Sequence, residues 1–181
     1  MDATQIFYAT DNAFTKSFRS ASEITDAEVK EYFSEWINNN RKPNSTFSDY
    51  HSTPDYCFVD GAVYDEESNT LYVFELKKRK VDSSTYDSAI IKQKKFNNMM
   101  QSAMSLRSQV FCNIKLILVS IYTNGVMYLW NINDYFTQST KAIKKVEEFH
   151  INNNPYIETP VFEYKFNDGV RVEDEKIKEI F

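Results

Sequence analysis

VDGAVYDEESNTLYVFELKKRK, residues 59–80, carries the clearest structural pattern in this chain. Residues rich in Tyr, Phe and Val flank a polar segment, residues 65–69, which is the pattern of two β-strands joined by a turn. We expect these strands over residues 56–64 and 70–77. The sequence therefore predicts a β-hairpin.

The charged residues of this hairpin are expected to face one another. A turn centred on residues 67–68 places Asp60 opposite Glu75. Cross-strand partners point to the same face of a sheet, with Cβ atoms ~5 Å apart. Lys77 follows Glu75 by two positions and projects from the same face. The sequence thus predicts two carboxylates and one lysine within a small volume.

This combination of residues suits a metal-dependent reaction. Two carboxylates that converge so closely repel each other unless a cation lies between them. Mg²⁺ and Mn²⁺ prefer hard oxygen ligands, and Mg²⁺ takes one or two carboxylates and keeps several waters. A lysine beside the ion can orient a water or stabilise negative charge on phosphorus. The alternative is a solvated strand face, where Glu and Lys two residues apart are common.

The rest of the chain alternates between helical and extended patterns. A capping box, Thr25 to Glu28, begins a helix over residues 25–39. The further elements that we expect are a helix at 84–106, strands at 114–122 and 126–132, a helix at 134–148, a strand at 160–166, a final helix at 172–181 and a short strand at 5–9. This order predicts an α/β fold with a mixed central β-sheet flanked by helices.

The hairpin and its flanking elements resemble the core of the PD-(D/E)XK nuclease superfamily. In that family an acidic residue on one strand is followed by Glu-x-Lys or Asp-x-Lys on the next, and then by a helix and another strand. Here Glu75-Leu76-Lys77 supplies the second motif, and the resemblance covers roughly residues 25–132. It implies a restriction-endonuclease-like core in a single domain, 1–181, with residues 1–24 and 133–181 as peripheral additions.

The resemblance also implies roles for individual residues. Asp60, Glu75 and the backbone carbonyl of Leu76 would bind the metal, and Lys77 would serve the attacking water or the transition state. Asp55, which follows Pro54, is an alternative to Asp60, because a β-bulge would shift the register. Glu35 on the first helix is a further candidate ligand.

Gln93 is a candidate because of its place in the helix expected at 84–106. It falls within an apolar stripe, and a core-facing glutamine is costly unless it makes hydrogen bonds. The stripe consists of Tyr86, Ala89, Ile90, Phe96, Met100 and Met104. The resemblance places a Gln or Lys of this helix at the catalytic site. The alternative is a glutamine that is satisfied by backbone groups.

Basic residues near the motif are candidate nucleic-acid contacts. Lys78, Arg79, Lys80 and Lys94 could hold phosphates that flank the cleaved bond. The alternative is a solvated strand end and a solvated helix face. The net charge of −5 argues against attraction of nucleic acid to the whole surface, but a local basic patch remains compatible with it.

Composition limits the other classes of protein. The 181 residues include 42% hydrophobic residues, which suits a folded domain, and the two cysteines, Cys57 and Cys112, lie in apolar surroundings that predict buried thiols. No apolar run reaches ~20 residues and no secretory signal is visible, so we expect an intracellular, cytoplasmic protein that does not bind a membrane. Three glycines exclude a phosphate-binding loop and a dinucleotide fingerprint.

The leading expectation is a Mg²⁺- or Mn²⁺-dependent endonuclease or exonuclease that acts on DNA rather than RNA. Because no DNA-reading domain is evident, we expect structure-selective or nonspecific cleavage, as in recombination, DNA repair or a phage enzyme, and the resemblance allows a homodimer. The alternative is an inactive nuclease-fold module that binds nucleic acid or a protein, which the 15% aromatic content favours. In a third interpretation, the hairpin carboxylates are surface charges of an unrelated α/β domain.

Overall fold

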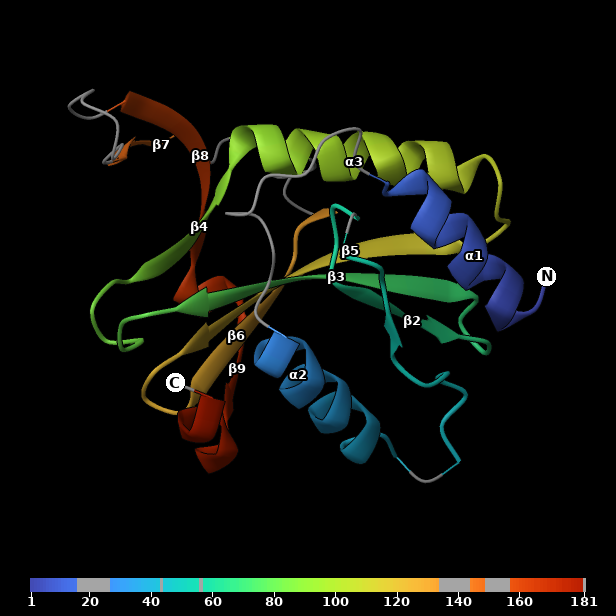
Figure 1. Cartoon of the computed structure of the whole chain (residues 1–181), viewed down its shortest axis with the longest axis horizontal. Helices are drawn as coiled ribbons and strands as arrows, with labels where there is room; N and C mark the ends of the chain where they lie inside the picture. The colour runs from blue at the N-terminus through green and yellow to red at the C-terminus, as the bar shows by residue number, and fades with distance from the viewer. Residues whose placement is uncertain (16–26, 43, 56, 134–143, 149–156, 181) are drawn as a thin grey trace.

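The computed structural model describes residues 1–15, 27–42, 44–55, 57–133, 144–148 and 157–180, and its central feature is a six-stranded sheet (Figure 1). The helices are α1 (Ala3–Ala13), α2 (Ala27–Asn39), α3 (Gln93–Arg107) and the 3₁₀ helices η3 (Phe166–Asp168) and η4 (Glu175–Ile180). The strands are β1 (His51–Ser52), β2 (Gly61–Asp65), β3 (Thr70–Arg79), β4 (Ser88–Lys92), β5 (Asn113–Tyr122), β6 (Val126–Asn131), β7 (Lys144–Glu148), β8 (Ile157–Lys165) and β9 (Val170–Glu173).

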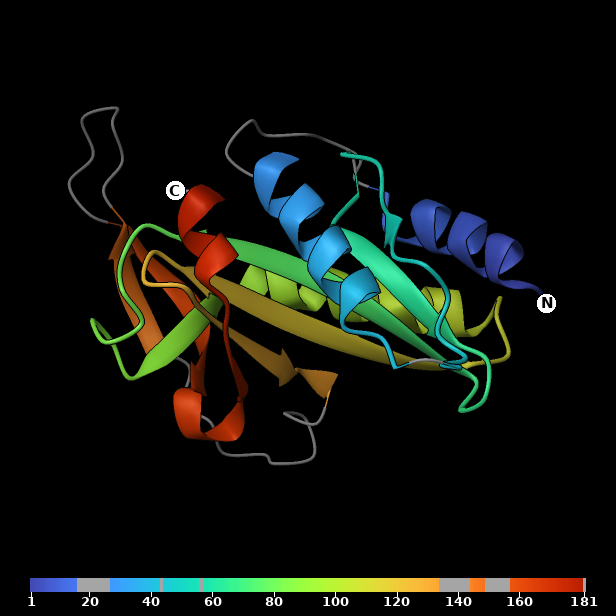
Figure 2. The same cartoon turned by 90° about the horizontal axis from the view of Figure 1, so that it is seen from below.

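The large sheet has the strand order β1-β2-β3-β5-β6-β9. All neighbouring strands in it are antiparallel except β3 and β5, which are parallel and are connected through β4 and α3. Helices α1 and α3 cover one face of this sheet, and α2 and η4 cover the other (Figures 1 and 2). The predicted α/β class with a mixed sheet flanked by helices is therefore confirmed.

The hairpin of β2 and β3 has the predicted register. Its pairs run from Asp65 opposite Thr70 to Gly61 opposite Phe74. The backbone N–H of Asp60, one residue before β2, donates to the carbonyl of Phe74 at 2.8 Å, so the regular pairing stops one residue short of Asp60. At the turn, Asn69 adopts a φ of 47°, a left-handed conformation that asparagine tolerates.

The side chains of β3 build two separate cores. Leu71 and Val73 pack with Phe96 and Met99 of α3, whereas Phe74 and Leu76 pack in the cluster that contains Val29 and Phe33 of α2. This alternation follows from the period of two along a strand. Because apolar residues occupy both faces of β3, the strand lies in the middle of the molecule.

The segment before α3 departs from the prediction. Residues 88–92 form β4 rather than helix, and they pair with β8 in a second sheet of order β4-β8-β7. Ala89 and Ile91 are buried on alternate positions of β4, so pairing with β8 prevails over the helical spacing of the apolar residues. The strand predicted at 160–166 is confirmed as β8.

Three other expectations fail. Residues 5–9 belong to helix α1, which begins at a capping box in which Gln5 N–H donates to the Asp2 carboxylate at 2.9 Å. Residues 144–148 form strand β7 instead of helix, because they pair with β8. The chain end forms β9 and a 3₁₀ helix. The capping residue Thr25 and residues 134–143 lie outside the described residues.

Two further expectations concern membrane insertion and the cysteines. No helix in the described ranges is long and apolar enough to cross a membrane. Cys57 and Cys112 are buried thiols that form no disulfide among the described residues, as their apolar neighbours predicted.

Candidate functional site

The chemical character of β3 changes along the side that faces α3. Leu71 and Val73 on this side are buried apolar residues. The next three residues on the same side of the strand are Glu75, Lys77 and Arg79. These charged residues occupy the carboxyl end of β3, beside the carboxyl end of its parallel neighbour β5. In sheets with parallel strands, ligands bind at this edge. The sequence thus places a charged cluster where such folds bind their ligands.

Glu75 is the most deeply buried member of the cluster. Its exposed fraction is 1%, its Oε1 lies 2.5 Å from Lys77 Nζ, and its Oε2 lies 2.9 Å from Lys95 Nζ of α3. Both carboxylate oxygens are shut off from solvent. Burial by itself raises the pKa of Glu75, but attraction to Lys77 and Lys95 outweighs it and holds the pKa below its ordinary value. Glu75 is therefore ionised and enclosed by two ammonium groups.

Asp60 is fixed by the backbone of the Glu-x-Lys motif. Its Oδ2 accepts a hydrogen bond from Leu76 N–H at 2.7 Å, and the residue is only 6% exposed. Asp60 therefore lies beside Glu75, as predicted, and is bonded to the residue between Glu75 and Lys77. The interpretation in which these carboxylates are surface charges is wrong, because both are buried. The metal-binding role of the Leu76 carbonyl stays a prediction.

Helix α2 reaches the site through Lys30, which the sequence did not single out. Lys30 Nζ lies 3.1 Å from Asp55 Oδ1 and 3.9 Å from Asp60 Oδ1. The two alternative aspartates are thus brought together at one lysine. Glu35, the predicted contributor from α2, is exposed. Five helical positions separate Glu35 from Lys30, and this spacing turns the two side chains to different sides of the helix.

The charges of this cluster balance. Three lysines, Lys30, Lys77 and Lys95, face three carboxylates, Asp55, Asp60 and Glu75, so the formal charges cancel. We call these six residues the charge cluster. A buried carboxylate that loses its partner lowers the stability of the fold by several kcal/mol. Glu75 can therefore be buried in its ionised form only because the lysines are beside it.

Tyr50 and Gly61 pack next to the charge cluster. The Tyr50 ring contacts Phe33 and Phe74, and its buried hydroxyl has no hydrogen-bond partner among the described residues. Burial, then the charges of Asp60 and Glu75, raise the Tyr50 pKa well above its ordinary value. A Cβ atom at Gly61 would lie 2.2 Å from the hydroxyl oxygen, so only glycine permits this approach.

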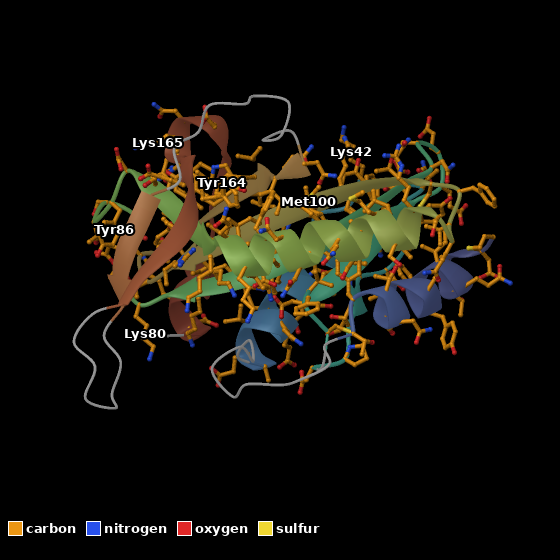
Figure 3. The ribbon with its side chains drawn as sticks, turned by 90° about the horizontal axis from the view of Figure 1, so that it is seen from above. Lys42, Lys80, Tyr86, Met100, Tyr164 and Lys165 are labelled. Atoms are coloured by element: carbon orange, nitrogen blue, oxygen red, sulfur yellow. The ribbon has the colours of Figure 1, made fainter. Side chains whose placement is uncertain are left out.

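The predicted nucleic-acid contacts lie in different surroundings. Arg79 is occupied inside the fold, where Nη2 donates to the Ile90 carbonyl at 2.8 Å and Nε to Ser120 Oγ at 3.3 Å, and burial lowers its pKa. Lys78 is half-buried, and Lys80 and Lys94 are exposed. Figure 3 shows Lys80 at the end of the molecule, away from the middle of α3 where Met100 lies. Lys94 stands in the first turn of α3, beside Lys95.

Gln93 is the first residue of α3 and is partly exposed. The stripe predicted around it is wrong, because residues 88–92 are a strand and Met104 is 71% exposed. The buried residues of α3 are Phe96, Met99, Ala103 and Leu106. Lys95 precedes Met99 by one helical turn and therefore points to the sheet. If the helix had been predicted to start at Gln93, the helical spacing would have identified Lys95 as a residue that faces the sheet.

The donor set fits a magnesium-type ion but not zinc. Asp60 and Glu75 offer carboxylate oxygens from adjacent strands, and Mg²⁺ needs only one or two carboxylates because it keeps waters. Within the described residues, no group of three or more His, Cys, Asp or Glu side chains could hold an ion. His51 is engaged elsewhere: its Nε2 lies 3.0 Å from Asp11 Oδ1, and its ring stacks on Phe7.

A hollow of about 750 Å³ lies on the α2 side of the sheet, away from this chemistry. Its walls include the end of α2 and the following loop, and its floor includes Tyr72, Ile117 and Leu129. None of the residues of the charge cluster lines it. Asp65 and Glu67 also line the hollow, but Lys42, the lysine among its lining residues, is exposed, so the hollow holds no buried lysine of the kind found in the charge cluster.

No family model, no curated protein and no solved structure matches this chain.

Proposed function

We propose that this protein is a Mg²⁺- or Mn²⁺-dependent nuclease of the PD-(D/E)XK type that hydrolyses phosphodiester bonds of DNA. The observation on which the proposal depends is the joint placement of Asp60, Glu75 and Lys77. Asp60 and Glu75 are buried, the Asp60 carboxylate accepts a hydrogen bond from the N–H of Leu76 next to Glu75, and Lys77 touches Glu75. A fold gains no stability from burying such charges instead of apolar residues, so the cluster favours a chemical role.

The order of elements supports a restriction-endonuclease-like core. Helix α2 is followed by three antiparallel strands, β1, β2 and β3. Strand β4 of the second sheet comes next, then α3, and then β5, which is parallel to β3. This is the order in which the family resemblance places its first helix, the catalytic hairpin, the second helix and the next strand.

Each residue of the site has a distinct task in this proposal. Asp60 and Glu75 would hold the ion, together with the Leu76 carbonyl, and Asp55 lies close enough to Lys30 to share that region. A bound Mg²⁺ or Mn²⁺ supplies Lewis acidity to the phosphate and to a bound water. Lys77 orients the attacking water or stabilises the charge that develops on the phosphate oxygens. Lys94 and Lys80, which are exposed, are available to adjacent phosphates.

The substrate follows from the resemblance and from the size of the chain. We propose DNA rather than RNA, cut in a structure-selective or nonspecific manner, by one copy or by a homodimer. The test is cleavage of duplex, single-stranded, flap and four-way-junction DNA and of RNA in EDTA, Mg²⁺ or Mn²⁺. Glu75→Gln and Lys77→Met should each lower the rate at least about a hundredfold.

Glu67→Gln is the matched control, because Glu67 is an exposed carboxylate in the hairpin turn and lies outside the charge cluster. Its rate should equal that of the wild-type protein. If the folded wild-type protein cuts no substrate in either metal, or if Glu75→Gln cuts normally, the nuclease proposal fails.

A catalytically inactive binding module is the second candidate. Two observations favour it: the charges of the cluster balance with lysines alone, and the apolar hollow on the opposite face offers a surface for a protein partner. The cleavage panel separates the two candidates. Absence of cleavage, together with retained binding of DNA or of a protein, would select the module.

A further inference from the structure

We propose that Lys95 is an internal cation that competes with the divalent metal for Glu75, so that the metal binds only when the Lys95 ammonium leaves the carboxylate. This inference rests on the proposed function and concerns how the same site is controlled. It assigns to Lys95 a regulatory role that none of the residue patterns in the hairpin indicates.

Each carboxylate oxygen of Glu75 lies against a lysine ammonium group. Lys77 Nζ occupies Oε1 at 2.5 Å and Lys95 Nζ occupies Oε2 at 2.9 Å. Both oxygens are buried from solvent, and the whole residue is 1% exposed. A divalent ion must approach a carboxylate oxygen to about 2.0–2.1 Å, so at least one ammonium group has to move.

Lys95, rather than Lys77, is the lysine that leaves in this proposal, because Lys77 is needed at the attacking water or the transition state. Lys77 sits within β3, two positions from Glu75, and its backbone is paired with Ser120 of β5. Lys95 reaches Glu75 from the first turn of α3, where its neighbours Lys92 and Lys94 are exposed to solvent. The Lys95 ammonium group can withdraw to this helix end by side-chain rotation alone, since the lysine side chain is a flexible stem of four carbons.

Electrostatics opposes the metal while Lys95 stays. Lysines already balance the carboxylates of the charge cluster and Arg79 adds a positive charge beside them, so an added divalent ion would meet an excess of positive charge. Removal of the Lys95 charge lowers this excess by one. The affinity of the metal-free protein for Mn²⁺ should therefore be low and should rise when Lys95 is neutralised.

The test measures Mn²⁺ binding by calorimetry, without nucleic acid, at fixed pH and ionic strength. Lys95→Met should bind Mn²⁺ at least about tenfold more tightly than the wild-type protein, a size typical of coupling between two ligands. Lys95→Arg, which keeps the charge, should bind as weakly as the wild-type protein. Lys115→Met is the control for net charge, because Lys115 is exposed and lies over the Tyr72 ring, outside the cluster.

Glu75→Gln separates failure of this inference from failure of the nuclease proposal. If Lys95→Met gains affinity and the gain disappears in Lys95→Met/Glu75→Gln, the competition is supported. If wild-type protein and Lys95→Met bind Mn²⁺ equally, and Glu75→Gln weakens both, the competition is overturned and the metal site stands. If no folded variant binds Mn²⁺, both proposals fail. Should Lys95→Met not fold, Lys95→Gln and the Lys95→Arg comparison decide the question.

Discussion

Glu75 with its two lysines lies on one face of the large sheet and the apolar hollow lies on the other, and the two regions differ in burial and in charge. On the α3 side, Glu75 is 1% exposed and its carboxylate is held between Lys77 and Lys95. On the α2 side, the hollow of about 750 Å³ has a floor of apolar and aromatic side chains and remains open to solvent. The cluster is buried and charged, whereas the hollow is accessible and largely apolar.

The solvent accessibility of a region and its content of charged, reactive side chains are therefore separate properties. An open apolar hollow is what surface packing leaves when α2 covers only part of the sheet, and it requires no special residue. Buried carboxylates are costly and persist only with partners in place. Perturbation of the two regions should therefore have unequal effects, both on stability and on cleavage.

The largest effect is expected for Glu75→Ala. It leaves Lys77 and Lys95 next to each other without their carboxylate, so the free energy of unfolding should fall by about 3–5 kcal/mol, and cleavage should be lost. Urea unfolding measures the first effect and the substrate panel the second. Glu67→Ala, at the rim of the hollow, should stay within about 0.5 kcal/mol of the wild-type protein. Equal losses in the two variants would remove the contrast between the regions.

A smaller effect is expected at Gly61, where the hairpin meets Tyr50. A Cβ in Gly61→Ala would lie 2.2 Å from the Tyr50 ring tip and 2.7 Å from the His51 carbonyl, so we expect a loss of about 1–3 kcal/mol. Thermal and urea unfolding measure it. In a double-mutant cycle with Tyr50→Ala, part of the loss should be recovered. A loss that is unchanged without the tyrosine ring would show that the clash with Tyr50 is not its cause.

Acidification should remove the stabilisation that ionised Glu75 gives to the charge cluster. The pKa of Glu75 is lower in the folded protein than its ordinary value of 4.5. The unfolded chain therefore binds the proton more readily, so the stability from Glu75 is present above about pH 4.5 and is lost as the pH falls through the folded pKa. Urea midpoints from pH 7 to pH 3 should fall less steeply in Glu75→Gln than in the wild-type protein. Parallel slopes would contradict this assignment.

The smallest effect is expected in the hollow. Val170 lines it from β9 and is 66% exposed, so Val170→Ser should change the free energy of unfolding by less than about 0.5 kcal/mol and leave DNA cleavage unchanged. Unfolding midpoints and initial cleavage rates check both statements. A change in cleavage rate would couple the hollow to the cluster across the sheet and would sharpen the case for a second functional surface.

Several elements could be predicted because their signals are local. The turn at residues 65–69 and the alternation on its two sides fixed the hairpin register, which the structure shows from Asp65 opposite Thr70 to Gly61 opposite Phe74. The apolar run of β5 and the turn at Gly125, with its φ of 80°, were equally clear. In these segments the pattern of side chains and the final pairing agree, so no distant contact alters the outcome.

Other elements could not be predicted because distant partners determine them. Residues 88–92 have helical spacing but pair with β8, more than 60 positions later in the chain, and this pairing moves the start of α3 to Gln93. The error displaced the functional interpretation from Lys95 to Gln93. Lys30 was missed for a similar reason, since only the packing of α2 against the hairpin brings it to Asp55 and Asp60.

Sequence patterns thus predicted the hairpin, the α/β class and the carboxylate pair. Each of these features depends on residues that are near one another in the chain, within one turn or one pair of strands. Tertiary structure alone decided which cations complete the site, because Lys30 and Lys95 come from helices on opposite sides of the sheet. Long-range packing selects such partners through burial and charge balance, and these are properties of the folded chain and not of any local segment.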